Sequence, residues 1–227
     1  MDIQEALGQY IGVIRKCRLF TGIPEERYPE TLRSLQAKLQ PYGKGEIIRV
    51  LGDDFPYAYY LLRGEVELSF FNRAYNQINI NRFLPGSLMG EALAFLKNAN
   101  SPVQLTAVEE SLMLLLDLSP LSRASDGFEY GHTLTVNLAR LLAGKNVFLN
   151  SRLHILAQKG VRDRILMYLS SLPKRSDGYV TLPFTKTALA EFLCVNRSAL
   201  SREFTKMAEE GILEIEGRRV KPRFCES

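Results

Sequence analysis

The chain has 227 residues, of which 46% are hydrophobic and 24% are charged, and its formal net charge is +4. This composition excludes a largely disordered or fibrous protein, and the length allows one large domain or two small ones. No apolar run reaches the ~20 residues needed to span a bilayer. The N-terminus lacks the basic and then apolar segments of a signal peptide. We therefore expect a soluble, cytoplasmic protein with no membrane partner.

The residues that usually bind metals or catalyse hydrolysis are few and scattered. The three cysteines are Cys17, Cys194 and Cys225, no CxxC motif is present, and the only histidines are His132 and His154. An odd number of distant cysteines does not suit a disulfide framework. We expect no metal site, no cofactor and no enzymatic activity, since no nucleophile–base set or glycine-rich phosphate loop is recognisable.

The net positive charge of the chain comes from its last third. Residues 1–154 contain 16 basic and 16 acidic side chains, whereas residues 155–227 contain 13 basic and 9 acidic ones. A weak excess of this kind can be an ordinary solvated face. It indicates nucleic-acid binding only where the same segment also carries a recognition motif.

The first part, residues 1–125, has the pattern of a β-rich domain after a short helical opening. In the opening, Leu32, Leu35 and Leu39 have helical spacing. Short apolar runs separated by Gly, Asp, Asn and Pro then predict a closed antiparallel sandwich or roll. One helical turn is expected at Ala92–Leu96. The predicted strands are Glu46–Leu51, Tyr57–Leu62, Glu65–Phe71, Gln77–Leu84, Val103–Val108 and Leu112–Leu116.

The second part, residues 126–157, predicts one long helix beginning near Gly127 and ending near Ala157. Its interior contains no proline. Leucines recur three, four or seven positions apart and form one apolar stripe, at Leu134, Leu138, Leu142, Leu149, Leu153 and Leu156. Such a stripe is typical of either a core helix or a dimer seam, and we favour the seam.

The third part, residues 158–227, predicts a winged helix-turn-helix. A helix is expected at Val161–Leu172 and a short strand at Tyr179–Leu182. Two helices, Thr185–Leu193 and Arg197–Glu210, follow, and a hairpin turning at Gly217-Arg218 closes the segment.

Within the pair of helices, Thr185 and Asn196 are suitable N-caps, and the tight connection is Cys194-Val195-Asn196. Leu189, Ala190, Phe192 and Leu193 would face inward on the first helix, and Leu200 and Phe204 on the second. This leaves polar residues outside, where a recognition helix enters the major groove. An arginine fork matches guanine, and a serine can donate or accept. The predicted DNA contacts are Thr185, Thr187, Arg197, Ser198, Ser201, Arg202, Lys206 and, at the wing, Arg218.

These segments together resemble the cAMP receptor protein/fumarate-nitrate reductase regulator (CRP/FNR) family of bacterial transcription factors. The matching pieces run in family order along nearly the whole chain: LFTGIPEE, YGKGEIIRVLGDD, YYLLRGEVEL, FLPGSLMGEALAF, RDRILMYLSSL and FTKTALAEFLCVNRSALSREFTKMAEEGIL. The resemblance implies an α+β protein with a cyclic-nucleotide-binding-like β-roll that senses an effector, a long dimerisation helix and a C-terminal winged helix-turn-helix.

The same resemblance implies a homodimer that binds a near-palindromic double-stranded operator, with RNA polymerase as a further possible partner. Arg197 and Arg202 correspond to the family's base-reading arginines. Ser198 stands where many members have glutamate, and Cys194 replaces the usual glycine of the turn. The first difference leaves the operator sequence open.

The effector predicted from the sequence is an unidentified small molecule rather than a cyclic nucleotide. Cyclic-nucleotide binders of the family place a phosphate-binding arginine about ten positions after the Gly-Glu pair. Here Gly90-Glu91 is followed by Ser101-Pro102, and no arginine lies between Arg82 and Arg123. A four-cysteine iron–sulfur cluster within one subunit is excluded. Haem is disfavoured because helix histidines are more often surface residues.

The predicted effector pocket is lined by Leu62, Gly90, Glu91, Ser101, Leu138 and Leu142. The alternative function is a stand-alone ligand-binding module of the cyclic-nucleotide type, with a C-terminal part that does not bind DNA. The two arginines on the second helix favour a DNA-binding regulator, and the missing phosphate arginine argues against the alternative.

Overall fold

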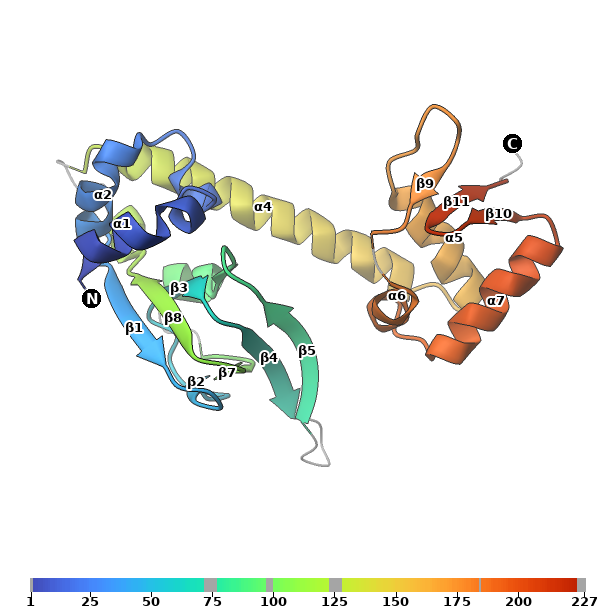
Figure 1. Cartoon of the computed structure of the whole chain (residues 1–227), viewed down its shortest axis with the longest axis horizontal. Coiled ribbons are helices and arrows are strands. Elements are labelled where there is room, and N and C mark those ends of the chain that lie inside the picture. Colours follow the sequence, from blue (N-terminus) through green and yellow to red (C-terminus); the bar gives the residue numbers. More distant parts are fainter. Residues whose placement is uncertain (1, 72–76, 97–99, 123–127, 184, 224–227) are drawn as a thin grey trace. The chain divides into compact units, whose positions relative to one another are not determined.

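The computed structural model describes residues 2–71, 77–96, 100–122, 128–183 and 185–223. The chain divides into two compact units, Met1–Ala143 and Gly144–Ser227. Figure 1 labels their helices and strands. None of the helices in the described part of the chain is long and apolar enough to cross a membrane.

The N-terminal unit begins with helices that the sequence patterns located only in part. They are α1 (Ile3–Ile14), the 3-10 turns η1 (Arg18–Phe20) and η2 (Glu25–Arg27), and α2 (Tyr28–Ser34). Asp2 and Glu5 form a capping box at the start of α1. The expectation that Leu39 continues the opening helix is wrong. Gln36 takes a left-handed conformation (φ 45°) that ends α2, and Leu39 pairs with Leu114 in a sheet.

Two four-stranded antiparallel sheets form the β-roll (Figure 1). All six predicted strands are present, and Ala92–Leu96 lies within α3 (Glu91–Leu96). The patterns missed β1, β6 and the 3-10 turn η3 (Ser119–Ser122). One sheet has the order β1 (Lys38–Tyr42), β8 (Ser111–Leu116), β3 (Ala58–Arg63), β6 (Leu88–Met89), and the other β2 (Ile47–Arg49), β7 (Gln104–Ala107), β4 (Val66–Phe71), β5 (Gln77–Phe83).

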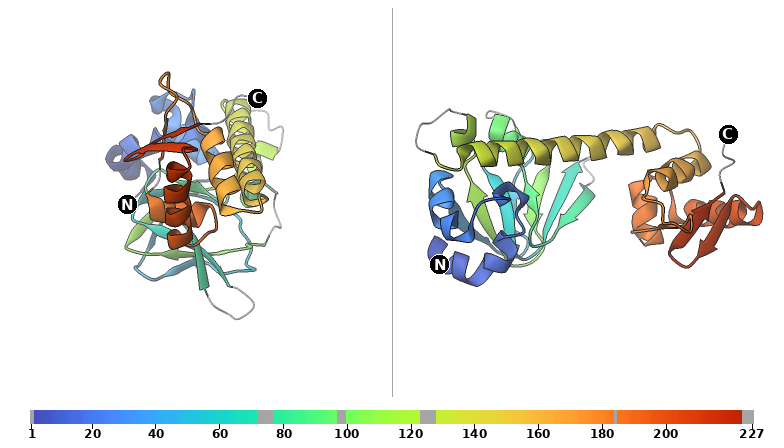
Figure 2. Two further views of the ribbon diagram at one scale, coloured as in Figure 1. Left: turned by 90° about the vertical axis from the view of Figure 1, so that its right-hand side faces the viewer. Right: turned by 90° about the horizontal axis from the view of Figure 1, so that it is seen from above.

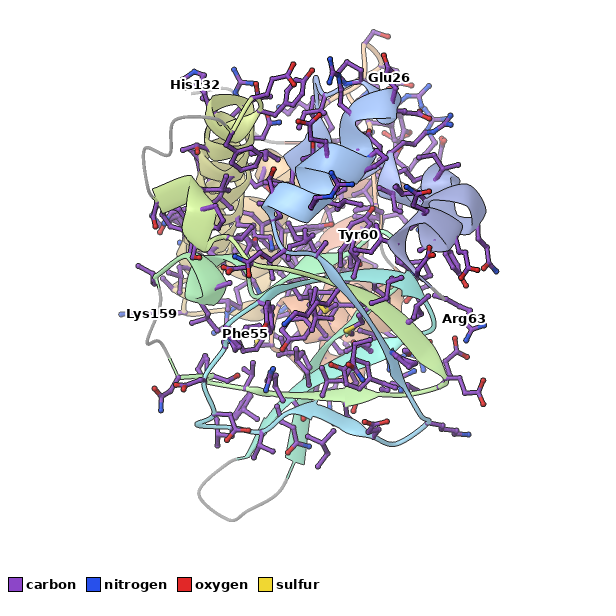
Figure 3. The ribbon with its side chains drawn as sticks, turned by 90° about the vertical axis from the view of Figure 1, so that its left-hand side faces the viewer. Glu26, Phe55, Tyr60, Arg63, His132 and Lys159 are labelled. Atoms are coloured by element: carbon purple, nitrogen blue, oxygen red, sulfur yellow. The ribbon has the colours of Figure 1, made fainter. Side chains whose placement is uncertain are left out.

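The side chains of β3 alternate between two apolar clusters. Tyr59 and Leu61 belong to the cluster between the sheets, together with Phe55. Tyr60 and Leu62 pack on the helical side, where the Tyr60 hydroxyl donates to the Val13 carbonyl oxygen over 2.6 Å. Figure 3 labels Phe55 and Tyr60 inside this unit.

The long helix α4 (Gly131–Leu156) confirms the predicted central helix, whose expected start at residues 126–127 lies outside the described residues. Its leucines do not form one seam. Leu134 and Leu138 are buried in the core of the N-terminal unit, and Leu142 packs against that core. Leu149 and Leu153 are 55% and 62% exposed. The first half of the stripe is therefore core. Figure 2 shows the course of α4 from two directions.

The C-terminal unit has the predicted order of elements. It contains α5 (Val161–Ser171), β9 (Val180–Thr181), α6 (Lys186–Phe192), α7 (Arg197–Glu209), β10 (Leu213–Glu216) and β11 (Arg219–Pro222). Its three strands form one sheet in the order β10-β11-β9. The buried core joins all three helices to this sheet through residues such as Leu169, Leu189, Phe204 and Val220.

Candidate nucleic-acid interface

The first helix of the pair, α6, is capped and packed as its sequence predicts. The Thr185 hydroxyl oxygen accepts a hydrogen bond from the Ala188 backbone N–H over 3.2 Å, which satisfies one of the free donors at the helix start. Leu189, Ala190 and Leu193 are buried. Phe192 is only partly buried, and its ring lies 5.4 Å from that of Tyr168. Thr187 is exposed at this end of the helix.

The turn between α6 and α7 has a left-handed residue at Cys194, with φ 51°. This is the conformation that glycine adopts most easily at the end of a helix. The Val195 backbone N–H donates to the Ala190 carbonyl oxygen over 2.9 Å and closes the turn. Although Cys194 replaces the glycine usual in the family, the turn thus keeps the left-handed backbone that a glycine would adopt.

The second helix, α7, separates an apolar face from a polar one. Leu200, Phe204 and Met207 are buried, and Asn196 caps the helix by accepting from the Ser198 backbone N–H over 2.9 Å. The remaining face begins at the N-terminal end of the helix. Of the residues predicted to read bases, Arg197, Ser198 and Arg202 are exposed and Ser201 is partly exposed, and we call these four the α7 polar face.

The two arginines of the α7 polar face are available for an anion or a base edge. Neither the Arg197 guanidinium nor the Arg202 guanidinium makes a hydrogen bond or ion pair with any described residue. An uncompensated guanidinium is strongly attracted to phosphate and to guanine. Lys206 lies further along, with its Nζ 4.0 Å from Glu210 Oε1, so its charge is partly compensated.

Arg162, on α5, binds two acids of α7 and was not singled out by sequence reasoning. Its Nε lies 2.7 Å from Glu203 Oε1 and its Nη1 lies 2.7 Å from Glu210 Oε2. Mainly through its hydrogen bond, Arg162 holds the pKa of the Glu210 carboxyl below its usual value. Because the partners lie more than 40 positions apart, no local sequence signal reveals this link.

The wing is the hairpin of β10 and β11, which turns at Gly217 with φ 60°. Arg218 is exposed at the tip, and its Nη2 donates to the Pro183 carbonyl oxygen over 2.8 Å. Arg219 faces an acid instead, since its Nη2 lies 2.6 Å from Asp177 Oδ2. Its guanidinium also lies 4.4 Å from the Tyr179 ring centroid. Of these two arginines, Arg218 is therefore the better candidate for a phosphate contact.

The six residues predicted to line an effector pocket are located mostly in packed parts of the N-terminal unit. Leu62 and Leu138 are core residues, and Leu142 packs against them. Glu91 is buried. Gly90 has φ 72°, and a Cβ at this position would overlap the ring of Phe55. The geometry of Gly90 therefore leaves no room for a side chain beside this ring.

Ser101 stands about ten positions after Gly90-Glu91, where cyclic-nucleotide binders of the family have their phosphate-binding arginine, and it is buried and bonded within its own loop. Its hydroxyl donates to the Val103 carbonyl oxygen, and its backbone joins Gly52 and Asp53. The unit has a cavity of about 280 Å³ that is lined by none of the six residues, although Phe55, beside Gly90, lines it. It is lined by Asp54, Phe55, Pro56, Tyr57, Ala94, Asp117 and Ser119.

Comparison with known domains gives two matches in the expected order. Residues 39–126 match the cyclic nucleotide-binding domain, and residues 163–222 match the Crp-like helix-turn-helix domain. None of the curated protein sequences matches the chain significantly.

Solved structures share the fold along most of the chain. The chain is 23% identical to the Thermus thermophilus catabolite activator protein, covering 91% of this chain and 93% of that one with a TM-score of 0.54. The c-di-GMP responsive global regulator CLP of Xanthomonas campestris is 19% identical, with 87% and 100% covered and a TM-score of 0.53. CprK complexed with OCPA is 17% identical, with 84% and 90% covered and a TM-score of 0.54.

The two domain matches account for the β-roll and for the capped pair of helices followed by a wing. Their order along the chain is the order that the sequence motifs indicate. The chain therefore belongs to the cAMP receptor protein/fumarate-nitrate reductase regulator family of DNA-binding transcription regulators.

Proposed function

We propose that this protein is a cytoplasmic, homodimeric regulator that binds a near-palindromic operator through α7 and responds to a small molecule other than a cyclic nucleotide. The observation that carries the proposal is the α7 polar face. There the guanidinium groups of Arg197 and Arg202, without acidic partners among the described residues, lie in the first two turns of a capped helix. This arrangement suits a helix whose first turns lie in the major groove.

The predicted contacts take different roles in this proposal. Arg197, Ser198, Ser201 and Arg202 would contact base edges, because they lie on the exposed side of the first two turns of α7. Phosphate contacts hold the protein in register and carry no sequence information directly. We assign that role to Thr185 and Thr187 at the start of α6, to Lys206 on α7 and to Arg218 at the wing.

The exposed second half of α4 supports the proposed dimer. Leu149 and Leu153 are 55% and 62% exposed and lie four positions apart, on one side of the helix. Large apolar side chains exposed on a shared face favour burial against another protein surface. A second copy of the same helix is the partner that the family organisation implies. The paired subunits would then present two α7 helices to two half-sites, which is why we expect a near-palindromic operator.

Two observations support an effector other than a cyclic nucleotide: the hydrogen bonding of the Ser101 hydroxyl and the absence of an arginine from the segment around it. The Ser101 hydroxyl is bound within its own loop, and the segment from 83 to 122 contains no arginine. A buried cyclic phosphate without a charge-assisted partner would be strongly unfavourable. The fold itself is compatible with other ligands, as the OCPA-complexed CprK shows for that protein.

The proposal is tested by selecting duplexes from a random DNA library with the full-length protein. We expect one two-fold symmetric sequence to be enriched. Fluorescence anisotropy should then show tighter binding to this sequence than to a scrambled duplex of the same composition. Equal affinity for both duplexes would refute sequence-specific binding. Native mass spectrometry of the protein as purified would identify the effector, and RNA polymerase recruitment can be measured on the selected operator.

A further inference from the structure

The cap of α7 uses both hydrogen-bond donors of Ser198. The Asn196 Oδ1 atom accepts the Ser198 backbone N–H over 2.9 Å. It also accepts the Ser198 hydroxyl over 2.5 Å. Ser198 is exposed at the second helical position, directly after Arg197 and one turn before Arg202. The residue that holds the helix start is therefore also part of the α7 polar face.

The direction of these bonds follows from elementary hydrogen-bond chemistry. A backbone N–H can only donate, so the side-chain atom of Asn196 that faces it has to be the carbonyl oxygen rather than the amide nitrogen. A carbonyl oxygen has lone pairs and no hydrogen, so the Ser198 hydroxyl has to donate to it. Because a serine hydroxyl carries a single hydrogen, only its two lone pairs remain for an outside partner.

We infer that Ser198 reads DNA as an acceptor only and selects a base with an exposed amino group. This inference rests on the proposed function. In the major groove, adenine N6 and cytosine N4 are donors, whereas guanine O6 and N7 and thymine O4 are acceptors. At the one position that Ser198 contacts, the operator should therefore have A or C on the contacted strand and disfavour G and T.

The neighbouring Ser201 provides a contrast within the same helix. Its hydroxyl makes no hydrogen bond to another described residue, although its carbonyl oxygen accepts from the Thr205 hydroxyl over 3.1 Å. A free hydroxyl rotates to donate or to accept. The restriction to A and C, the bases with an exposed amino group, thus belongs to Ser198. It originates in Asn196, which acts as a positioning residue for specificity.

The experiment uses the selected operator and replaces each base pair in turn. With the wild-type protein, one position in each half-site should bind A or C about three- to tenfold more tightly than G or T, the value of one ordinary hydrogen bond. Ser198→Ala should abolish the preference at this position and leave the preferences at other positions intact. Ser198→Thr keeps the hydroxyl and should keep the preference.

Variants of the cap residue Asn196 test directly whether the Ser198 hydroxyl can only accept a hydrogen bond from a base. Asn196→Asp keeps an acceptor for both donors, so the preference for A or C should persist. Asn196→Gly removes the acceptor and lowers helix stability only slightly. The released hydroxyl can then also donate, and the difference between the two classes of base should fall below twofold. Thr205→Ala removes an exposed hydroxyl from the same helix and should change no base preference; circular dichroism checks that every variant is folded.

The outcomes separate this inference from the proposed function. Enrichment of a symmetric operator without any position that depends on Ser198 would overturn the inference and leave the function standing. A Ser198-dependent preference for G or T would also overturn it, since the hydroxyl would then be donating. Failure to enrich any sequence would overturn both.

Discussion

Arg164 on α5 donates a hydrogen bond from its Nη1 to the carbonyl oxygen of Leu193, the last residue before the turn of the helix pair, over 3.1 Å. Its Nε donates to the Gln158 carbonyl oxygen over 3.0 Å. Carbonyl groups at the end of a helix lack partners within the helix. One partly buried guanidinium thus ties the turn before the recognition helix to the segment that precedes α5.

Replacing Arg164 should destabilise the C-terminal unit. Arg164→Ala leaves the Leu193 carbonyl without its charged donor, and hydrogen bonds of this type contribute about 1.5–3 kcal/mol. Thermal denaturation should show a lower Tm for this unit. Arg164→Lys should rescue little, because one ammonium group cannot reproduce the spread of the guanidinium donors. The matched control is Lys159→Ala at an exposed position, and an equal loss of stability there would contradict the assignment.

Arg202 and Lys206 should affect DNA binding in different ways. Arg202→Ala should reduce affinity for the selected operator by about 1–3 kcal/mol if the arginine contacts guanine with two hydrogen bonds. Affinity for scrambled DNA should change much less. Lys206→Ala should weaken binding to every sequence alike and reduce the salt slope by about one unit. Titrations of both duplexes at several salt concentrations distinguish the two. Equal losses on both duplexes for Arg202→Ala would mean that Arg202 contacts phosphate. The base-reading positions of α7 would then have to be reassigned.

The proposed dimer seam is best tested at the exposed end of α4. Leu153→Arg introduces a charge at a 62% exposed position, so the fold should survive while the dimer weakens. Ser151→Arg is the matched control, because residue 151 points away from the side shared by Leu149 and Leu153. Sedimentation at micromolar protein without DNA is the measurement. A wild type that is only monomeric would refute the seam. Leu142→Arg should instead destabilise the N-terminal unit, where Leu142 packs against the core.

Cyclic AMP should bind weakly or not at all. The hydroxyl of buried Ser101 is already bound to the Val103 carbonyl oxygen, and no arginine is present from residue 83 to residue 122 to neutralise the cyclic phosphate. Calorimetry at millimolar nucleotide, with AMP as a control, should give no saturable heat. A micromolar dissociation constant for cyclic AMP would overturn this argument about the effector.

The ion pair between Arg162 and Glu210 should stabilise the protein only at pH values where the Glu210 carboxyl is ionised. Arg162 lowers the folded-state pKa of Glu210 from its usual 4.5. A group with a lowered folded pKa stabilises the protein above its unfolded pKa, and this contribution disappears as the pH falls through the folded value. Glu210→Gln should lower the Tm slightly at pH 7, and the difference from wild type should vanish in acid. A difference that is constant with pH would exclude the ionic link.

The sequence by itself determined the features that depend on near neighbours in the chain. The caps Thr185 and Asn196 bond to residues two or three positions away, and the α7 polar face follows from helical spacing. Most strand positions could be predicted for the same reason, since alternation and turn residues are local, but β1 and β6 were not. The family resemblance rested on these short motifs, whose order along the chain is retained in the fold.

Only the tertiary structure decided which partners meet across long distances in the chain. The leucine spacing of α4 revealed an apolar face, but not that Leu134 and Leu138 are buried in the N-terminal core while Leu149 and Leu153 are left exposed. Leu39 joined a sheet because a partner strand more than 70 positions away pairs with it. Arg162 and Arg164 gained their roles in the same way. Periodicity shows that a surface needs covering, and only packing determines what covers it.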